Sequence, residues 1–216
     1  MSTAHSDAIA VLGAGGHAKV VIATLQAAGF TVAAAFDDDS TKHGGSLLGV
    51  EVQGTLDDFA GSGFRRAVLA IGDNATRMRL AERLENRLPA IEWVVAVHPH
   101  VCLHYSVKLG AGAVVFAGAV IQPDALIGAH AIINTGATID HDCRVGNFAH
   151  IAPGVRLAGE VQVGRGAFLG IGASVIPGRA VGEWAVIGAG ATVVNDIPPH
   201  ATAVGVPARV LNKETR

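Results

Sequence analysis

The second half of the chain repeats every six residues. From Val97 to Val193, every sixth position is Val, Ile or Leu, seventeen positions in succession. A second series lies four residues after the first: every sixth residue from Ala113 to Ala173 is small or β-branched. The next position in this series, Arg179, is an exception. A period this strict indicates a β-solenoid. Each hexad would give one short strand with an inward aliphatic and an inward small side chain.

The composition fits a narrow core and excludes several classes of partner. Half of the 216 residues are hydrophobic, but only 5% are aromatic, so Val, Ile, Leu and Ala must fill the interior. A net charge of −2 without any basic run gives no reason to expect binding to nucleic acid or to a membrane. Cys102 and Cys143 form no CxxC pair, and the start "MSTAHSDAIAVLGAGG" lacks a basic leader region. We therefore expect a cytoplasmic protein without disulfides, with Cys143 buried at an inward small position.

The first half begins with a nucleotide-type βαβ pattern. Residues 8–12 are an apolar strand, and "GAGGHA" from Gly13 to Ala18 matches G-x-G-x-x-A. A helix is predicted over 17–28, closed by Gly29, and a second strand over 31–36. The glycines let backbone N–H groups approach a phosphate, and the helix N-terminus adds a partial positive charge. The acids that follow the second strand, Asp37, Asp38 and Asp39, can accept hydrogen bonds from hydroxyls or a base edge.

A third strand over 67–72 leads into a capped helix, "DNATRMRLAERL", over 73–84. With strands near 8, 32, 51 and 67, the unit is too short for a full dinucleotide domain. An NAD site and a purely structural glycine turn stay as alternatives to a nucleotide-diphosphate cradle, which the pattern favours. We predict a Rossmann-like α/β domain over 1–95 and an all-β parallel β-helix with a C-terminal tail over 96–216.

The six-residue pattern resembles the hexapeptide-repeat acyltransferases. That resemblance implies a left-handed parallel β-helix with three hexads per coil, and a homotrimer with active sites between neighbouring helices. The order of the two domains is similar to the sugar acetyltransferases, which include sialic acid O-acetyltransferases and N-acetyltransferases of nucleotide-linked 4-amino sugars. Four stretches carry the likeness: "GAGGHAKV" (13–20), "AIGDN" (70–74), "INTGATIDHDCRVGNFAHIAPG" (133–154) and "VGVPAR" (204–209). Within the family the chain most resembles members that act on GDP-perosamine, in surface polysaccharide (O-antigen) synthesis.

The resemblance also implies where the ligands bind. The nucleotide sugar would contact a set in the first domain, with Asn134 helping to place it: Gly13, Gly15, Gly16, His17, Asp37, Asp38, Gly72 and Asn74. Acetyl-CoA, the expected co-substrate, would lie along a second set: His150, Gly159, Ile171, Gly188, Ala189, Pro207 and Arg209.

The acidic stretch "TIDHDC" holds the candidate catalytic base. Ile139 and Cys143 occupy inward positions, so residues 140–142 face outward. A histidine with an ordinary pKa of about 6.5 suits general-base catalysis near neutral pH. The resemblance makes His141 the base and Asp142 its orienting partner, although Asp140 competes for that role. The amine would attack acetyl-CoA directly, without an acyl-enzyme, and the Gly159 N–H would stabilise the oxyanion.

Three alternatives stay open. The same histidine could deprotonate a hydroxyl in a sugar O-acetyltransferase of the sialic acid type. Hexapeptide helices also carry zinc in enzymes of the carbonic anhydrase type, but three ligands must converge, and His141 and His150 are expected on different faces, so no metal is predicted. The third alternative is a trimer that senses nucleotides without catalysis. The sequence leaves open the base, guanine or uracil, and the sugar.

Overall fold

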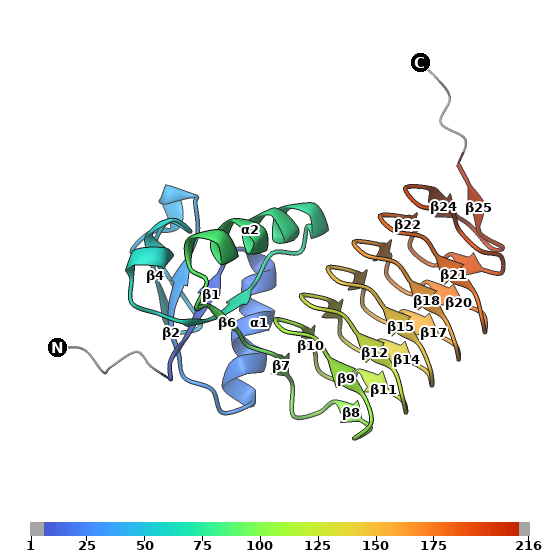
Figure 1. Cartoon of the computed structure of the whole chain (residues 1–216), viewed down its shortest axis with the longest axis horizontal. Helices are drawn as coiled ribbons and strands as arrows, with labels where there is room; N and C mark the ends of the chain where they lie inside the picture. Colours follow the sequence, from blue (N-terminus) through green and yellow to red (C-terminus); the bar gives the residue numbers. More distant parts are fainter. Residues whose placement is uncertain (1–6, 212–216) are drawn as a thin grey trace, which may run out of the picture. The chain divides into compact units, whose positions relative to one another are not determined.

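The computed structural model describes residues 7–211. The chain divides into two compact units, the first ending at Pro99 and the second beginning at His100. Both helices belong to the first unit, and the second is a stack of short strands and turns (Figure 1). A Rossmann-like domain followed by a parallel β-helix is therefore confirmed as the fold class.

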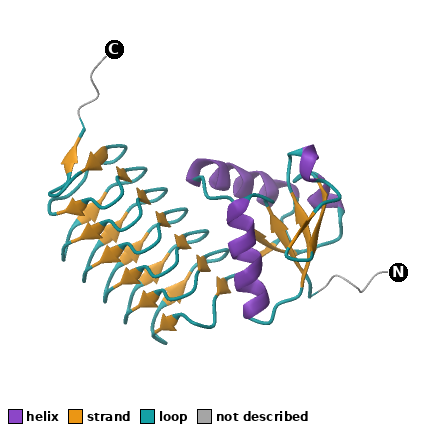
Figure 2. Ribbon diagram, turned by 180° about the vertical axis from the view of Figure 1, so that it is seen from behind, coloured by secondary structure: helices purple, strands orange, loops and turns teal. Residues whose placement is uncertain are grey.

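The first unit is built on a six-stranded sheet with the order β3-β4-β2-β1-β5-β6. Five strands run parallel, and β3 is antiparallel to β4 (Figure 2). Their bounds are β1 Ile9–Leu12, β2 Val32–Phe36, β3 Ser46–Leu47, β4 Val50–Gly54, β5 Arg66–Leu69 and β6 Glu92–Trp93. The central strand β1 is completely buried, as its uninterrupted apolar sequence predicts for a parallel sheet.

Two helices and two single 3₁₀ turns complete this unit. They are α1 Gly16–Ala27, α2 Asn74–Arg87, η1 Ser40–Lys42 and η2 Asp58–Gly61. The buried side of α1 has the helical spacing of Ala18, Val21, Ile22 and Leu25. Helix α2 begins where the Asp73 carboxylate accepts a hydrogen bond from the backbone N–H of Thr76 at 2.8 Å. The carboxyl ends of β1, β2, β4 and β5 share one edge of the sheet, where the glycine loop and the acids lie.

A complete coil of the second unit contains three short strands, which have two residues each up to β23. Val114 pairs with Ile132 and Ile132 with His150, so one coil takes 18 residues. The strands form three parallel faces. The first face holds β10 Val114–Val115, β13 Ile132–Ile133, β16 His150–Ile151, β19 Phe168–Leu169, β22 Val186–Ile187 and β24 Thr202–Val204, with β25 Arg209–Val210 antiparallel at its end.

The second face holds β8 Cys102–Leu103, β11 Val120–Ile121, β14 Thr138–Ile139, β17 Arg156–Leu157, β20 Ser174–Val175 and β23 Thr192–Val193. The third face holds β9 Lys108–Leu109, β12 Leu126–Ile127, β15 Arg144–Val145, β18 Gln162–Val163 and β21 Ala180–Val181. The short strand β7, Ala96–Val97, precedes the first complete coil.

The six-residue pattern predicts the core of the coils. From Val115 to Val193 every sixth residue is buried, and so are the small positions from Ala113 to Ala173. The first positions of the series differ, since Leu103 is 37% exposed. Leu103 belongs to the first coil, which ends the stack and has a further coil on one side only.

Across residues 7–211, neither helix has the length and apolar character needed to cross a membrane.

Candidate active site

His141 lies on an outward corner of the β-helix, between β14 and β15. The inward neighbours Ile139 and Cys143 are both fully buried, which turns residues 140–142 outward as predicted. Nδ1 of the His141 ring lies 2.8 Å from Oδ2 of Asp142. Asp140 instead accepts a hydrogen bond from the backbone N–H of His141 at 2.8 Å. The ring is therefore oriented by Asp142, and Asp140 shapes the turn.

The other side of the ring lies over Gly159, one coil further along. A Cβ placed on Gly159 would be 2.6 Å from both Cε1 and Nε2 of His141, which is closer than atoms can approach. The carbonyl of His141 also accepts a hydrogen bond from the N–H of Glu160 at 3.0 Å. Only glycine leaves room here for the imidazole, so Gly159 is required for the position of the candidate base.

Carboxylates surround the imidazole and favour its protonated form. The hydrogen bond that His141 donates to Asp142 raises the pKa of His141 above its ordinary value of 6.5, and the charges of Asp140, Asp142 and Glu160 act in the same direction. The side chain is 55% exposed, so solvent and a ligand can reach it. The result is a stronger base than a free histidine, with Nε2 as the nitrogen available to a substrate.

Cys143, beside this corner, is unsuited to be a nucleophile. It is fully buried, and burial raises the pKa of its thiol to about 11. The thiol donates a hydrogen bond to the carbonyl oxygen of Ala158 at 3.1 Å. The prediction of a buried Cys143 thiol is confirmed.

Asn134 and His150, predicted to contact substrate and acetyl-CoA, contact each other. The Asn134 side-chain nitrogen lies 3.2 Å from Nε2 of His150. His150 is only 9% exposed and packs edge-on against Phe168, with ring centroids 5.3 Å apart. His150 belongs to the first face, and Asn134 opens the turn that leads from the first face to the second.

Three of the remaining acetyl-CoA positions, Ile171, Gly188 and Ala189, follow the same turn along later coils. We call this edge the Ile171 corner (residues 134–136, 152–154, 170–172 and 188–190), and the edge of residues 140–142 and 158–160 the His141 corner. Ile171 is 63% exposed, and its carbonyl accepts a hydrogen bond from Gly190 at 2.8 Å, which places Gly188 and Ala189 one coil away. The exposed residues Pro207 and Arg209 lie near the C-terminal end of the coils.

The predicted acetyl-CoA positions are therefore divided between two edges of one chain. Gly159 lies on the His141 corner, whereas Ile171, Gly188 and Ala189 lie on the Ile171 corner. The second face, with β14, β17 and β20, separates these corners. One copy of the β-helix does not bring them together.

In the first unit, the three glycines of the loop have different reasons to be glycine. Gly13 has φ +112°, and a Cβ there would lie 2.9 Å from the carbonyl oxygen of Ala70. A Cβ on Gly15 or Gly16 would meet no protein atom within 4 Å. Gly13 is thus required by the fold itself, while Gly15 and Gly16 leave an open approach to the N-terminus of α1, where a phosphate would bind.

Asp37 holds the glycine loop against the end of β2. Its Oδ2 accepts a hydrogen bond from the Ala14 N–H at 2.6 Å, and its Oδ1 accepts from the Asp39 N–H and from Lys42 Nζ. Burial alone would raise the pKa of Asp37, but these hydrogen bonds outweigh it and lower the pKa. Whether Asp37 also touches a ribose or base stays a prediction.

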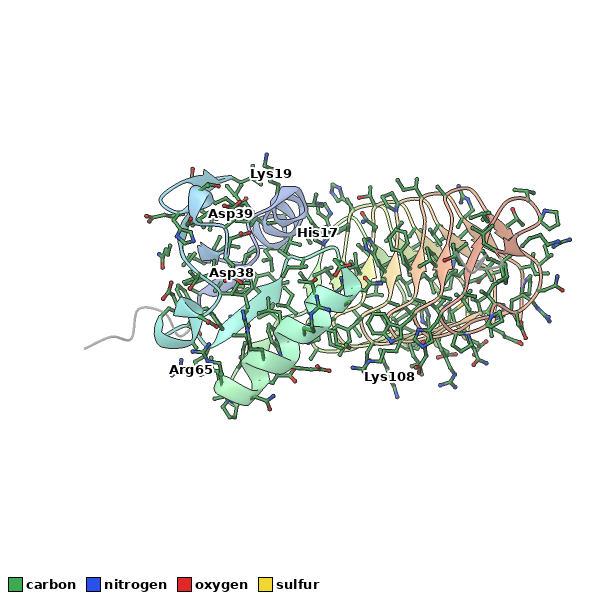
Figure 3. All side chains as sticks on the ribbon, turned by 90° about the horizontal axis from the view of Figure 1, so that it is seen from above. His17, Lys19, Asp38, Asp39, Arg65 and Lys108 are labelled. Carbon is green, nitrogen blue, oxygen red and sulfur yellow. The ribbon has the colours of Figure 1, made fainter. Side chains whose placement is uncertain are left out.

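Asp38 has a more open position than Asp37. It is exposed, and Figure 3 shows it with Asp39 on the loop after β2. Its Oδ1 accepts a hydrogen bond from the Leu56 N–H at 2.9 Å, and its Oδ2 lies 3.9 Å from Arg83. The carboxylate is therefore fixed in place but reachable by a ligand.

Arg77 is a residue of this region that the sequence reasoning missed. It is 1% exposed and donates hydrogen bonds to the carbonyls of Ile71 and Gly72 and to Oδ1 of Asn74. Asn74, predicted to line the ligand, is itself buried and holds Arg77. The available signal was its spacing, because Arg77 shares the buried side of α2 with Leu80, Ala81 and Leu84.

His17, on the first turn of α1 (Figure 3), is electrically coupled to Arg77. Burial, and after it the positive charge of Arg77, together lower the pKa of His17 to about 4. His17 is therefore neutral at physiological pH.

Among the described residues 7–211, no three His, Cys, Asp or Glu side chains come together as a metal site would require.

Comparison with known proteins places the chain in a family. Residues 8–84 match the family described as the PglD N-terminal domain. A comparison with curated protein sequences gave no match.

The chain is similar over almost its whole length to solved structures. A mutant of perosamine N-acetyltransferase from Caulobacter crescentus, in complex with CoA and GDP-perosamine, has 44% identity and a TM-score of 0.90, over 95% of this chain and 97% of that one. The acetyltransferase domain of PglB from Neisseria gonorrhoeae has 34% identity and a TM-score of 0.89, over 95% and 100%. WeeI from Acinetobacter baumannii, at 23% identity and a TM-score of 0.70, shares the fold. The chain thus belongs to the hexapeptide-repeat sugar acetyltransferase family and is an acyltransferase.

Proposed function

We propose that the chain transfers the acetyl group of acetyl-CoA to the 4-amino group of a nucleotide-linked amino sugar, with GDP-perosamine as the best candidate. The observation that carries the proposal is the corner at His141, where Asp142 binds Nδ1 and leaves Nε2 over Gly159. The relative at 44% identity supports the substrate, since it was solved with CoA and GDP-perosamine. Such a reaction belongs in the synthesis of a surface polysaccharide.

The proposed chemistry is direct transfer. The sugar nitrogen attacks the thioester carbon and forms a tetrahedral adduct, and Nε2 of His141 takes a proton from that nitrogen. The adduct then collapses, the C–S bond breaks, and the imidazolium returns the proton to the departing sulfur. Asp142 keeps Nδ1 protonated and stabilises the imidazolium. The N–H of Gly159 is the proposed oxyanion donor.

The nucleotide is proposed to bind at the glycine loop of the first unit. Gly15 and Gly16 leave the N-terminus of α1 open to the diphosphate. Asp37 orders the loop through Ala14, and Arg77 holds the opposite wall at Gly72. The bonds that already occupy Asp37 leave Asp38 as the acid better placed for the ligand.

The active site is proposed to form between copies in a homotrimer. The His141 corner of one copy would supply the base, and the Ile171 corner of its neighbour would supply the other wall of the acetyl-CoA groove. The separation of these corners within one chain supports this assembly, because neither corner carries the full set of predicted residues.

The test is a thiol-release assay with acetyl-CoA and a panel of acceptors. The panel holds GDP-perosamine, a UDP-linked 4-amino sugar, CMP-sialic acid and free sialic acid. We expect release with GDP-perosamine, and a fall in kcat of about 10²- to 10⁴-fold for His141→Asn. His200→Asn is the matched control, because His200 is also exposed on a corner, in the last coils, and should keep wild-type activity.

Activity only on a hydroxyl acceptor would instead favour a sugar O-acetyltransferase. Unchanged kcat in His141→Asn would contradict the mechanism, and trapping of an acetylated protein with acetyl-CoA alone would contradict direct transfer.

A further inference from the structure

A pocket of about 320 Å³ lies at the carboxyl edge of the sheet in the first unit. Its apolar walls are Leu56, after β4, Ile71, after β5, and Leu80 of α2. Charged groups stand at its rim: Asp38, after β2, with Arg79 and Arg83 of α2. Apolar walls with a few polar groups are typical of a pocket that binds a small organic ligand. The rim adds one acceptor group and two donor groups.

The polar groups at the rim are held in fixed positions. Arg79 Nη2 donates a hydrogen bond to the Thr76 hydroxyl at 2.9 Å. Arg83 lies between the carboxylates of Asp38 and Asp57, at 3.9 and 3.8 Å. The Leu56 N–H fixes the other oxygen of Asp38. Within residues 7–211, Arg83 pairs with two carboxylates, whereas Arg79 has none within ion-pair distance and need not leave one when a ligand arrives.

We propose that this pocket binds the base of the nucleotide and that Arg79 and Asp38 select guanine. Guanine presents two acceptors, O6 and N7, on one edge, and guanidinium groups bind that pair with two hydrogen bonds. Its N1–H and 2-amino group are donors that suit a carboxylate. Arg79 supplies the first contact and Asp38 the second. The inference rests on the proposed function, because it names the base of that same substrate.

The same groups disfavour uracil. Uracil offers one acceptor, O4, where guanine offers the O6/N7 pair, and it has no amino group beside its N3–H, so neither charged residue can form its two hydrogen bonds. A site built to form hydrogen bonds rejects a ligand that lacks the matching groups more strongly than an apolar pocket rejects a smaller ring. Arg79 and Asp38 therefore act as specificity residues, apart from the groups that move protons at His141.

The experiment measures binding of GDP, IDP and UDP to the full-length chain by calorimetry, without acetyl-CoA. IDP differs from GDP only by the missing 2-amino group. The variants are Arg79→Met and Asp38→Asn, and Arg87→Met is the matched control. Arg87 lies on the same helix and pairs with Asp57, but it does not line the pocket. All three replaced side chains are exposed, so each variant should keep the wild-type melting temperature.

We expect the wild type to bind GDP at least about tenfold more tightly than UDP. Arg79→Met should lose about tenfold or more in affinity for GDP and clearly less for UDP, which can form only one of the two hydrogen bonds. Asp38→Asn should lose the preference for GDP over IDP, and Arg87→Met should match the wild type. Equal binding of GDP and UDP by the wild type overturns the proposal. So does an equal loss for both nucleotides in Arg79→Met, which would indicate a phosphate contact.

Failure of this inference can be told apart from failure of the proposed function. Acetyl transfer to GDP-perosamine with an unchanged KM in Arg79→Met would keep the function and overturn the pocket assignment. Guanine selection at Arg79 with no acetyl transfer to any amino sugar would keep the pocket and overturn the function.

Discussion

The two nitrogens of His141 have different surroundings. Asp142 has φ +59°, and this left-handed conformation accompanies a carboxylate turned back onto Nδ1. Asp140 instead accepts the backbone N–H of His141. The sequence could not decide between these acids, because both adjoin the histidine and only the local dihedral angles separate them.

Asp142→Asn should move the pH dependence of catalysis. His141 must be neutral to accept a proton, so kcat/KM falls as the pH drops through its pKa. Asp142 raises that pKa, so the wild-type midpoint should lie above 6.5 and the variant's midpoint should move down toward 6.5. We also expect at least about a tenfold fall in kcat, because the tautomer is no longer fixed.

Asp140→Asn is the comparison for this measurement. Asp140 acts on the ring only through its charge, so its removal should shift the midpoint in the same direction by less. A pH profile of Asp142→Asn that coincides with the wild-type profile would contradict the assigned pairing.

Gly159→Ala should reduce catalysis without unfolding the protein. The added methyl group would meet Nε2 and Cε1 at 2.6 Å and displace the half-exposed imidazole rather than the backbone. A displacement of about 1 Å can cost about 10²-fold in rate. We expect kcat to fall by that order while the melting temperature stays within a few degrees, and full activity would show that the ring has room to move.

At the scale of elements, the glycine loop serves both the fold and ligand binding: Gly13 is needed by the fold, and Gly15 leaves space for a ligand. Gly13→Ala should destabilise the first unit by about 1–3 kcal/mol, because its φ is positive and the new methyl would press on the Ala70 carbonyl. Gly15→Ala should leave thermal unfolding unchanged, because its side chain would point into open space.

Gly15→Ala, which should not affect stability, should affect nucleotide binding. If a diphosphate lies at the N-terminus of α1, Gly15→Ala should weaken GDP binding measured by calorimetry while the folded fraction stays complete. Wild-type GDP affinity in Gly15→Ala would place the phosphates elsewhere.

The sequence predicted elements well where a period or a cap governs them. The predicted helix over 17–28 is observed as α1, Gly16–Ala27, and the aliphatic period predicted the coils. The third strand was predicted over 67–72, but β5 ends at Leu69, since Arg77 binds the carbonyls of Ile71 and Gly72 and turns the chain. Contacts such as Asp37 with Ala14 join distant segments and leave no local signal.

At the scale of the whole molecule, the two-corner arrangement predicts complementation between inactive chains. His141→Asn removes the base from one corner, and Ile171→Glu places a charge in the proposed acetyl-CoA groove on the other. Ile171 is exposed, so this variant should fold. Co-expressed at equal amounts, the two chains should recover about a quarter of wild-type activity if they mix at random in a trimer.

Each variant expressed alone provides the control for this experiment, and size-exclusion chromatography with light scattering gives the number of copies. Mixtures that stay as inactive as the separate variants would show that each chain carries a complete site.

The uniform coil also sets a scale of length along the protein. Neighbouring strands in a sheet lie about 4.8 Å apart, so each coil of 18 residues adds about 4.8 Å to the length of the β-helix. Asn134 and Gly188 occupy equivalent positions three coils apart, and thus about 14 Å from each other. A molecule bound along this edge therefore meets equivalent positions at intervals of one coil. Insertion or deletion within the β-helix should be tolerated in units of one coil, and each such change would alter the length of ligand that fits.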